Sequence, residues 1–413
     1  MNQAIKNRIA EIKAGKVPTG YVEAGKRFIP SEWKVVRLRD LFDRLNRRNT
    51  TGNDNVLTLS AQHGLIKQND FFNKEVASKN KDNYVLLKKG EFAYNKSYSG
   101  SYYFGAIKIL ERYDEGIVSP LYICFSAKEG VNKEFYKQYF AAKLFNFEIL
   151  RIAQEGARNH GLLNLAIDDF FNIKIIEPPT EEQLEIAKVL VKWDEAIALQ
   201  KKVIDRLERQ KKAYLEKFLT QGENAEKLEK HIVQKRVRNK IGSKNVLSVS
   251  NKFGFTSQRE QFGKIVASKE LSNYKIVTKG DIAFNPSRIN IGSIALYLGE
   301  EVGIVSPMYS IFSCKETLDP YVLLLILKTR KAKHKIHSSL AGSVRDTLSI
   351  NALENIELTI PKKEVQKKIK EFFVSLDDLI ELNNKKLEAL KLQKQSLMQL
   401  LLTGIVRVKG GTK

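Results

Sequence analysis

The chain has 413 residues, and its formal net charge of +23 gives an isoelectric point near 9.6. This length allows two or three domains, and so strong a positive charge favours a polyanion, nucleic acid first, as the partner. An anionic membrane surface is less favoured, because the basic residues are dispersed and no amphipathic anchor stands out. Only two cysteines occur, Cys124 and Cys314, which excludes a disulfide framework and a zinc ribbon. We find no signal peptide and no spanning segment, and therefore expect a cytoplasmic protein whose cysteines lie in cores.

The first 29 residues predict a short amphipathic helix and a connector. Isoleucines at positions 5, 9 and 12 share one face of that helix. The connector contains a near miss to a phosphate-binding loop at Gly20, Gly25 and Lys26, but Arg27 stands where a magnesium-binding Ser or Thr is needed. No apolar strand precedes it, so we predict no nucleotide site here.

Residues 30–179 predict a first α+β domain. Val35 to Leu38 indicate a first strand or a short helix. Aromatic and β-branched runs separated by Gly and Asn turns then predict strands, and one helix interrupts them near 134–152. The predicted strands are 55–59, 84–87, 92–94, 106–110 and 121–125.

The same domain is repeated in residues 223–361. The string from Lys89 to Asn95 returns 190 residues later, from Lys279 to Asn285. Shorter strings return too: residues 76–79 at 266–269, and 116–120 at 303–307. The copies share scaffold strings, which indicates duplication of one unit.

Each domain is followed by a segment with heptad periodicity, at 180–222 and at 362–404, before a tail at 405–413. Apolar residues recur at alternating spacings of four and three from Ile186 to Phe218, and again 183 residues later from Ile369 to Leu401. Thr180 and Gln183 have the form of a capping box at the first helix start. We predict two long helices that pair as an antiparallel coiled coil; the alternative is that each stripe packs only on its own domain.

The polar residues in the seam suggest a register for that pair. If facing residue numbers sum to 594, Gln200 meets Lys394 and Lys211 meets Asn383, so that polar groups face polar groups. A slip would leave polar groups against apolar ones, at about 1 to 3 kcal/mol each. The predicted spacer interface consists of Trp193, Ile197, Gln200, Ile204, Leu207, Lys211, Asn383, Leu387, Leu390 and Lys394.

The two copies differ where a surface would contact DNA bases. After the shared Asn95 and Asn285 the side chains diverge, and a second divergent polar loop precedes each closing strand. Basic runs also lie near the start of each domain. Arg and Asn suit guanine and adenine edges, and Lys, Ser and Tyr can contact bases or phosphates. The candidate DNA-binding residues are Arg47, Arg48, Lys96, Tyr98, Tyr102, Arg158, Asn159, His160, Arg236, Arg238, Arg288, Asn290, Ser343, Arg345 and Thr347.

In its duplicated order of motifs the sequence resembles the specificity subunit of Type I restriction-modification enzymes. The resemblance covers nearly the whole chain. It lies in the string from Ile29 to Trp33, the Lys-Gly-acidic turns at 89–91 and 279–281, the string 178–183 before a long helix, and the ending 402–404. The string 361–366 departs from the pattern, because it lacks the second proline and the second acidic residue.

The resemblance implies two target recognition domains, each for one half of an interrupted, asymmetric double-stranded DNA site, separated by an antiparallel helical spacer. It also implies that two methyltransferase subunits dock on the spacer and that restriction subunits can join them. S-adenosylmethionine, ATP and magnesium are then expected only in those partners. For this chain we expect no catalytic residue, no cofactor and no metal.

Two other classes of function stay open on the sequence. The first is a methyltransferase or nuclease with an unusual site, although no Asn/Asp-Pro-Pro-aromatic loop fits and no Pro-Asp dipeptide begins a nuclease pattern. The second is a coiled-coil structural protein whose basic charge is incidental.

Overall fold

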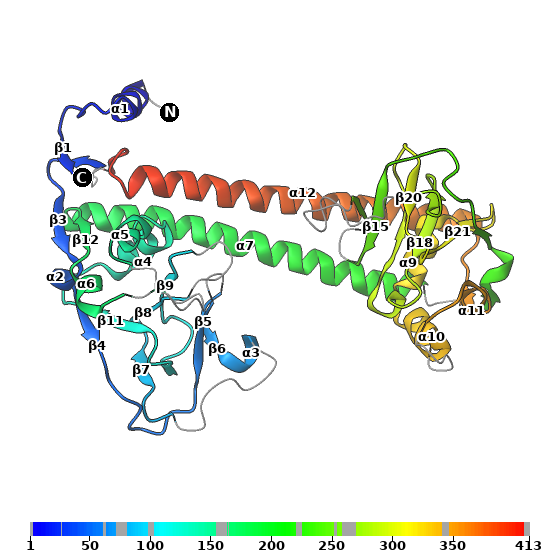
Figure 1. Cartoon of the computed structure of the whole chain (residues 1–413), viewed down its shortest axis with the longest axis horizontal. Helices are drawn as coiled ribbons and strands as arrows, with labels where there is room; N and C mark the ends of the chain where they lie inside the picture. The colour runs from blue at the N-terminus through cyan, green and yellow to red at the C-terminus, as the bar shows by residue number, and fades with distance from the viewer. Residues whose placement is uncertain are drawn as a thin grey trace. The chain divides into compact units, whose positions relative to one another are not determined.

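The computed structural model describes residues 3–25, 27–60, 63–71, 81–97, 103–153, 163, 165–219, 225–251, 254–257, 270–340 and 347–408. The chain forms two compact units (Figure 1), the first comprising Met1–Leu199 with Leu387–Lys413 and the second comprising Gln200–Lys386. Within the described residues, no helix combines the length and the apolarity needed to cross a membrane.

Unit 1 contains the first of the two repeated α+β domains. Its central sheet has the strand order β4-β11-β8-β9. The predicted strands all occur, and none of their ends is shifted by more than two residues. The strands are β1 (Tyr21–Ala24), β2 (Arg27–Pro30), β3 (Lys34–Arg37), β4 (Phe42–Leu45), β5 (Leu57–Ser60), β6 (Gly64–Lys67), β7 (Val85–Lys88), β8 (Phe92–Asn95), β9 (Ala106–Ile109), β10 (Glu115–Val118), β11 (Ile123–Ala127) and β12 (Lys174–Glu177). The shorter helices are α1 (Gln3–Lys13), α2 (Leu38–Leu41), α3 (Gln68–Phe71), α4 (Lys133–Ala141), α5 (Asn146–Ile152) and α6 (Ile167–Phe171).

An aromatic cluster joins the central sheet to the helices of unit 1. The rings of Phe42, Phe92, Phe125 and Phe140 lie 5.3 to 6.0 Å apart, mostly edge to face. The single helix predicted for 134–152 is wrong: it is two helices, α4 and α5. Lys143 between them has φ +60°, a left-handed conformation that ends an α-helix.

Unit 2 repeats this fold. Its central sheet has the order β14-β21-β18-β19, and Lys235 faces Ile311 as Leu45 faces Cys124 in unit 1, so the register is also shared. The strands are β13 (Ala225–Lys227), β14 (Ile232–Lys235), β15 (Val246–Ser250), β16 (Gly254–Ser257), β17 (Lys275–Val277), β18 (Asp281–Phe284), β19 (Ile294–Leu296), β20 (Gly303–Val305), β21 (Ser310–Cys314) and β22 (Glu357–Thr359). The helices are η1 (Leu228–Lys230), η2 (Ile289–Ile291), α9 (Pro320–Leu327), α10 (Arg330–Leu340) and α11 (Ile350–Glu354).

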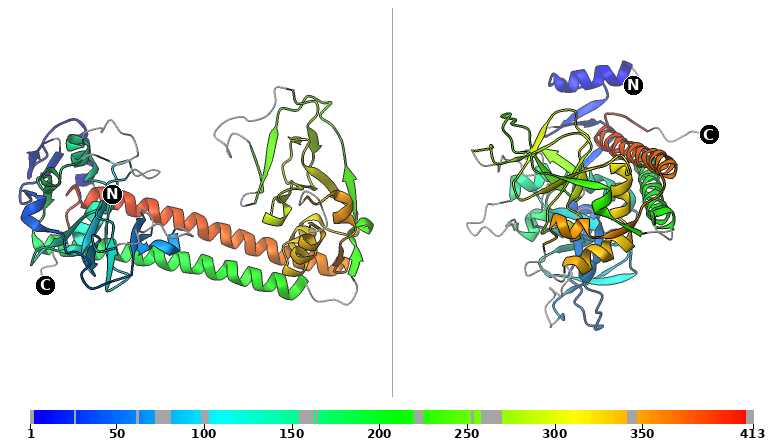
Figure 2. Two further views of the ribbon diagram at one scale, coloured as in Figure 1. Left: turned by 60° about the horizontal axis from the view of Figure 1, so that its bottom comes forward. Right: turned by 90° about the vertical axis from the view of Figure 1, so that its right-hand side faces the viewer.

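The two long helices are α7 (Thr180–Leu219) and α12 (Lys363–Leu401), and part of each belongs to each unit. Within each unit the two helix segments lie side by side (Figure 2), and ion pairs between them show that they are antiparallel.

The predicted capping box is wrong. The buried side chain of Gln183 donates to the carbonyl of Pro178 at 2.7 Å, and Gln366 donates likewise to Pro361 at 2.8 Å. Each glutamine therefore ties its helix to the preceding turn.

The predicted 594 register is also wrong. In unit 2, Gln200 donates to Oδ1 of Asn383 at 2.8 Å, and Lys211 pairs with Asp377. In unit 1, Lys394 pairs with Asp194 at 2.6 Å. The two ion pairs sum to 588 and the amide pair to 583, which are 6 and 11 below the predicted 594. The seam lysines can reach carboxylates beside the seam, because a lysine side chain is long and flexible, and an ion pair is stronger than a bond to a neutral amide.

Candidate nucleic-acid interface

In both domains a backbone hydrogen bond joins the described residues that flank the two divergent loops. The amide of Leu163, which follows the loop 156–160, donates to the carbonyl of Lys96 at 3.2 Å. In the second domain Leu348 donates to Pro286 at 3.0 Å in the same way. Segments about 65 residues apart in sequence are thereby brought to one place on each domain. This junction is the candidate reading surface.

Both junctions begin with the same turn. The side chain of Asn95 accepts from the amide of Ser97 at 2.9 Å, and Asn285 accepts from Ser287 at 3.1 Å. Such Asx turns fix the backbone locally whatever side chains follow. The shared asparagines therefore hold a constant frame from which different side chains project.

In the second domain this frame places two predicted residues on the surface. Arg288 precedes η2 and Asn290 lies within it, and both are exposed. Gly292 ends η2 with φ +91°, and a Cβ there would overlap the side chain of Asn251. Glycine is therefore required to turn the chain back into β19.

A basic cluster lies elsewhere on the second domain. The exposed side chains of Arg236 and Arg238 line a cavity of about 650 Å³ together with Lys275. Burial, and then the nearby charge of Arg236, lower the pKa of Lys275, whose ammonium donates to the carbonyl of Tyr309 at 2.6 Å. Lys275 is not among the residues predicted from the sequence, because only its isolated antiparallel bridge with Arg238 brings it beside the arginines.

The corresponding basic residues of the first domain are arranged differently. Arg47 is half-buried, and its guanidinium donates to Glu91 at 3.0 Å and to the carbonyl of Leu86 at 3.3 Å. Arg48 is exposed and Lys96 is half-buried. Of these three side chains, only that of Arg48 is exposed.

Of the remaining candidate residues, only Thr347 lies within the described part of the chain. Thr347 is half-buried just after the second loop. Tyr98, Tyr102, Arg158, Asn159, His160, Ser343 and Arg345 lie outside the described residues.

The comparisons with known proteins bear on the whole chain. The sequence model of the Type I restriction modification DNA specificity domain matches residues 30–209 and 220–392. The chain belongs to this family. It is a Type I restriction-modification specificity subunit with two DNA specificity domains, each on one copy of the repeat.

Two relatives agree with that assignment. The chain is 25% identical to the Type I restriction enzyme MjaVIII specificity subunit of Methanocaldococcus jannaschii, over 92% of this chain and 94% of that one. It is 27% identical to the putative MjaX specificity subunit of the same organism, over 73% and 71%. Two solved structures share the fold: a chain from a study of complex assembly and conformational transition of the type I R-M system, and the S subunit from M. genitalium. For the first the TM-score is 0.55 at 14% identity, covering 92% of this chain and 99% of that one; for the second it is 0.50 at 13%, covering 89% and 96%.

Proposed function

We propose that this specificity subunit recognises an interrupted, asymmetric DNA site, one half with each domain, while α7 and α12 set the gap and dock two methyltransferase subunits. One observation carries the proposal. The two domains share strand order, register and the Asn95 and Asn285 turns, yet the side chains that follow these turns differ. A duplicated frame with unlike side chains suits two different base sequences.

The chemistry is assigned to the partners. The chain itself supplies recognition and scaffold, and the methyltransferase and restriction subunits use S-adenosylmethionine, ATP and magnesium. Purified alone and incubated with DNA and S-adenosylmethionine or magnesium, the chain should transfer no methyl group and cut no strand. Activity that copurifies with this chain through several columns would favour the enzyme hypothesis instead.

Base reading by the second domain is tested with Arg288→Ala and Asn290→Ala. Each bidentate base contact is worth about 1 to 3 kcal/mol, so each loss should relax the preference at one position of one half-site and leave the other half unchanged. Arg236→Ala is the matched control, because loss of a phosphate contact should weaken binding to all sequences alike. Mapping methylated adenines in cells that also make the methyltransferase subunits measures both results. Changes in both halves from a single variant would refute the division of labour.

Methyltransferase docking is placed on the outward faces of the helices. Leu199 and Leu382 stand at equivalent positions of the repeat and are each 64% exposed. Leu199→Glu and Leu382→Glu should each weaken co-purification of one methyltransferase subunit and leave the melting temperature unchanged. Lys331→Glu, on the exposed surface of α10 and not on the long helices, is the charge control. Full recovery of both subunits with the double leucine variant would rule out this surface.

A further inference from the structure

Each unit contains a cavity between its helix pair and its recognition domain. The second cavity, in unit 2, measures about 980 Å³, and the first cavity, in unit 1, about 270 Å³. They are equivalent places in the repeat. Gly64 and Asp194 line the first, and Gly254 and Asp377, their counterparts 190 and 183 residues later, line the second.

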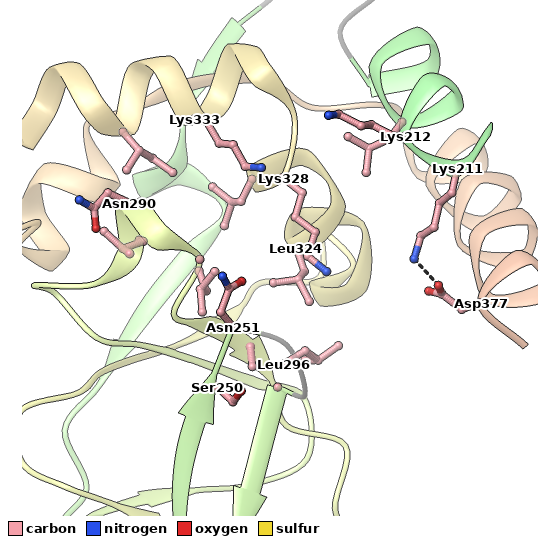
Figure 3. Close-up of a pocket in the computed structure, with 18 of the residues that line it drawn as sticks. Lys211, Lys212, Ser250, Asn251, Asn290, Leu296, Leu324, Lys328, Lys333 and Asp377 are labelled. Carbon is pink, nitrogen blue, oxygen red and sulfur yellow. Dashed lines mark hydrogen bonds and ion pairs between the residues drawn. The ribbon is translucent and has the colours of Figure 1, made fainter. Parts of the chain in front are cut away.

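Lysines outnumber carboxylates in both cavities. Around the second cavity the lysines are Lys211, Lys212, Lys328 and Lys333, and the carboxylates are Glu208 and Asp377. Figure 3 shows the four lysines and Asp377. Around the first cavity the lysines are Lys108, Lys137 and Lys394, and the carboxylates are Glu111 and Asp194. Both places are therefore suited to an anion.

The aspartates are already satisfied by other groups. Asp377 is paired with Lys211 and accepts from the hydroxyl of Tyr321 at 2.7 Å. Asp194 is paired with Lys394 and accepts from Gln138 at 2.7 Å. A second lysine in each cavity is thus not required to neutralise its aspartate.

That second lysine comes from a different element in each copy. Lys108 lies on β9, and its counterpart in unit 2 is Ala295; Lys328 follows α9, and its counterpart in unit 1 is Ala141. Neither lysine has an ion pair within the described residues. Both cavities therefore contain a second lysine, although it comes from a different position of the repeat in each. This indicates a function for the positive charge in the cavity.

The electrostatic surroundings agree with this geometry. Burial, and then the charge of Lys394, lower the pKa of Lys108. Burial, and then the charge of Lys211, lower the pKa of Lys328. A bound anion between the paired lysines would offset both effects.

The second cavity is continuous with the candidate reading surface. Asn290, on the exposed turn after Asn285, lines it together with Lys328 and Lys333. A DNA strand whose bases meet that turn would bring its phosphates to these lysines.

We infer that the two cavities are phosphate-binding sites for the DNA backbone, with Lys108 and Lys394 holding a phosphate in the first and Lys211 and Lys328 in the second. The inference rests on the proposed function. It adds that the backbone is gripped where each domain meets its helix pair, apart from the turns that contact bases.

The test uses the full chain with its methyltransferase subunits and duplexes with and without the recognised site. The affinity K falls as the salt concentration rises, and each phosphate contact adds about 0.9 to the steepness of log K against log salt concentration. Lys108→Gln and Lys328→Gln should each make this dependence less steep by about 1, on both duplexes, without changing the recognised sequence. Lys331→Gln is the control, because Lys331 is exposed on α10 and does not line the cavity. Unchanged melting temperatures establish that the variants fold.

Three other results are informative. A wild-type complex that binds no DNA overturns the proposed function. Wild-type binding with an unchanged slope in both variants overturns this inference alone. Saturable binding of ATP that is lost in Lys328→Gln, with the DNA slope unchanged, assigns the cavity to a free nucleotide and overturns the backbone assignment.

Discussion

At the residue scale, Glu182 is the buried carboxylate on which three segments of unit 1 converge. It accepts from Nε1 of Trp33 at 2.8 Å and from Nε of Arg407 at 2.6 Å, and Arg407 also donates to Glu32 at 2.7 Å. The hydrogen bond to Glu182 is the main reason that the pKa of Arg407 is raised. In the repeat the position of Glu182 is taken by Val365, which is exposed. The segment around Arg407 is therefore held in unit 1 by a contact that unit 2 does not share.

We predict that Arg407→Met destabilises unit 1 by about 2 to 4 kcal/mol. The buried carboxylate of Glu182 would then keep only the neutral indole N–H of Trp33 as a hydrogen-bond donor. Urea unfolding measures the loss. Arg209→Met removes the exposed pair with Asp205 and should cost about 1 kcal/mol or less. Equal, small losses in both variants would mean that Glu182 does not depend on Arg407.

The buried thiol of Cys124 makes the free energy of unfolding depend on pH. Burial raises the pKa of this thiol to about 12, whereas the pKa of a cysteine in an unfolded chain is about 8.5. The folded state therefore binds the proton more tightly, and the stability that this group contributes is complete below about pH 8.5 and is lost as pH rises toward 12. Urea midpoints should fall between pH 8 and pH 10, and less steeply in Cys124→Ala. A steeper fall in that variant would contradict the assignment.

At the element scale, the polar contacts between α7 and α12 involve equivalent positions of the two copies of the repeat. Gln200 and Asn383 are counterparts 183 residues apart, and they bond to each other. The pairs Lys211 with Asp377 and Lys394 with Asp194 are likewise counterparts. A slip by one heptad would separate the buried amide pair and both ion pairs, so the polar groups fix the register and give up some apolar contact.

We predict that Gln200→Leu alone costs about 1 to 2 kcal/mol, because Asn383 loses a partner, while Gln200→Leu with Asn383→Leu is neutral or stabilising. The double variant should also admit a slipped register. A double-mutant cycle in urea measures the first effect, and disulfide trapping between cysteines placed across the seam measures the second. Additive losses would show that the two amides act independently.

The turn after Asn285 depends on the left-handed backbone of Gly292. Gly292→Ala should cost about 1 to 2 kcal/mol from its left-handed backbone alone, with a further loss because the new Cβ overlaps Asn251. Reading by the second domain should weaken, since η2 must shift. Gly280→Ala, also at positive φ but in open space, separates backbone strain from overlap.

At the scale of the whole molecule, one duplicated unit supplies both recognition domains and both helices. The family match extends over both copies, residues 30–209 and 220–392. A helix pair built from matching seams can be lengthened without new packing, provided that whole heptads are added to both helices.

We predict that one heptad inserted between Gln200 and Lys201, with another between Leu382 and Asn383, lengthens the gap in the recognised site. Seven residues add about 10.5 Å of helix, or about three base pairs. Both half-sites should stay the same, as mapped by adenine methylation. A heptad in α7 alone should instead destabilise the pair. An altered half-site with an unchanged gap would overturn the spacer function.

The sequence by itself determined the duplication, the α+β class, the strands and the two long antiparallel helices, because periodicity and repeated strings are local and survive in one dimension. It also located the divergent turns after Asn95 and Asn285. Only the tertiary structure decided the register, the break at Lys143 and the capture of Arg47 by Glu91. It alone placed Lys108 and Lys328 in equivalent cavities. Those outcomes depend on which distant side chains come within hydrogen-bonding reach, and a long lysine or arginine can satisfy its charge with any carboxylate that the fold brings near.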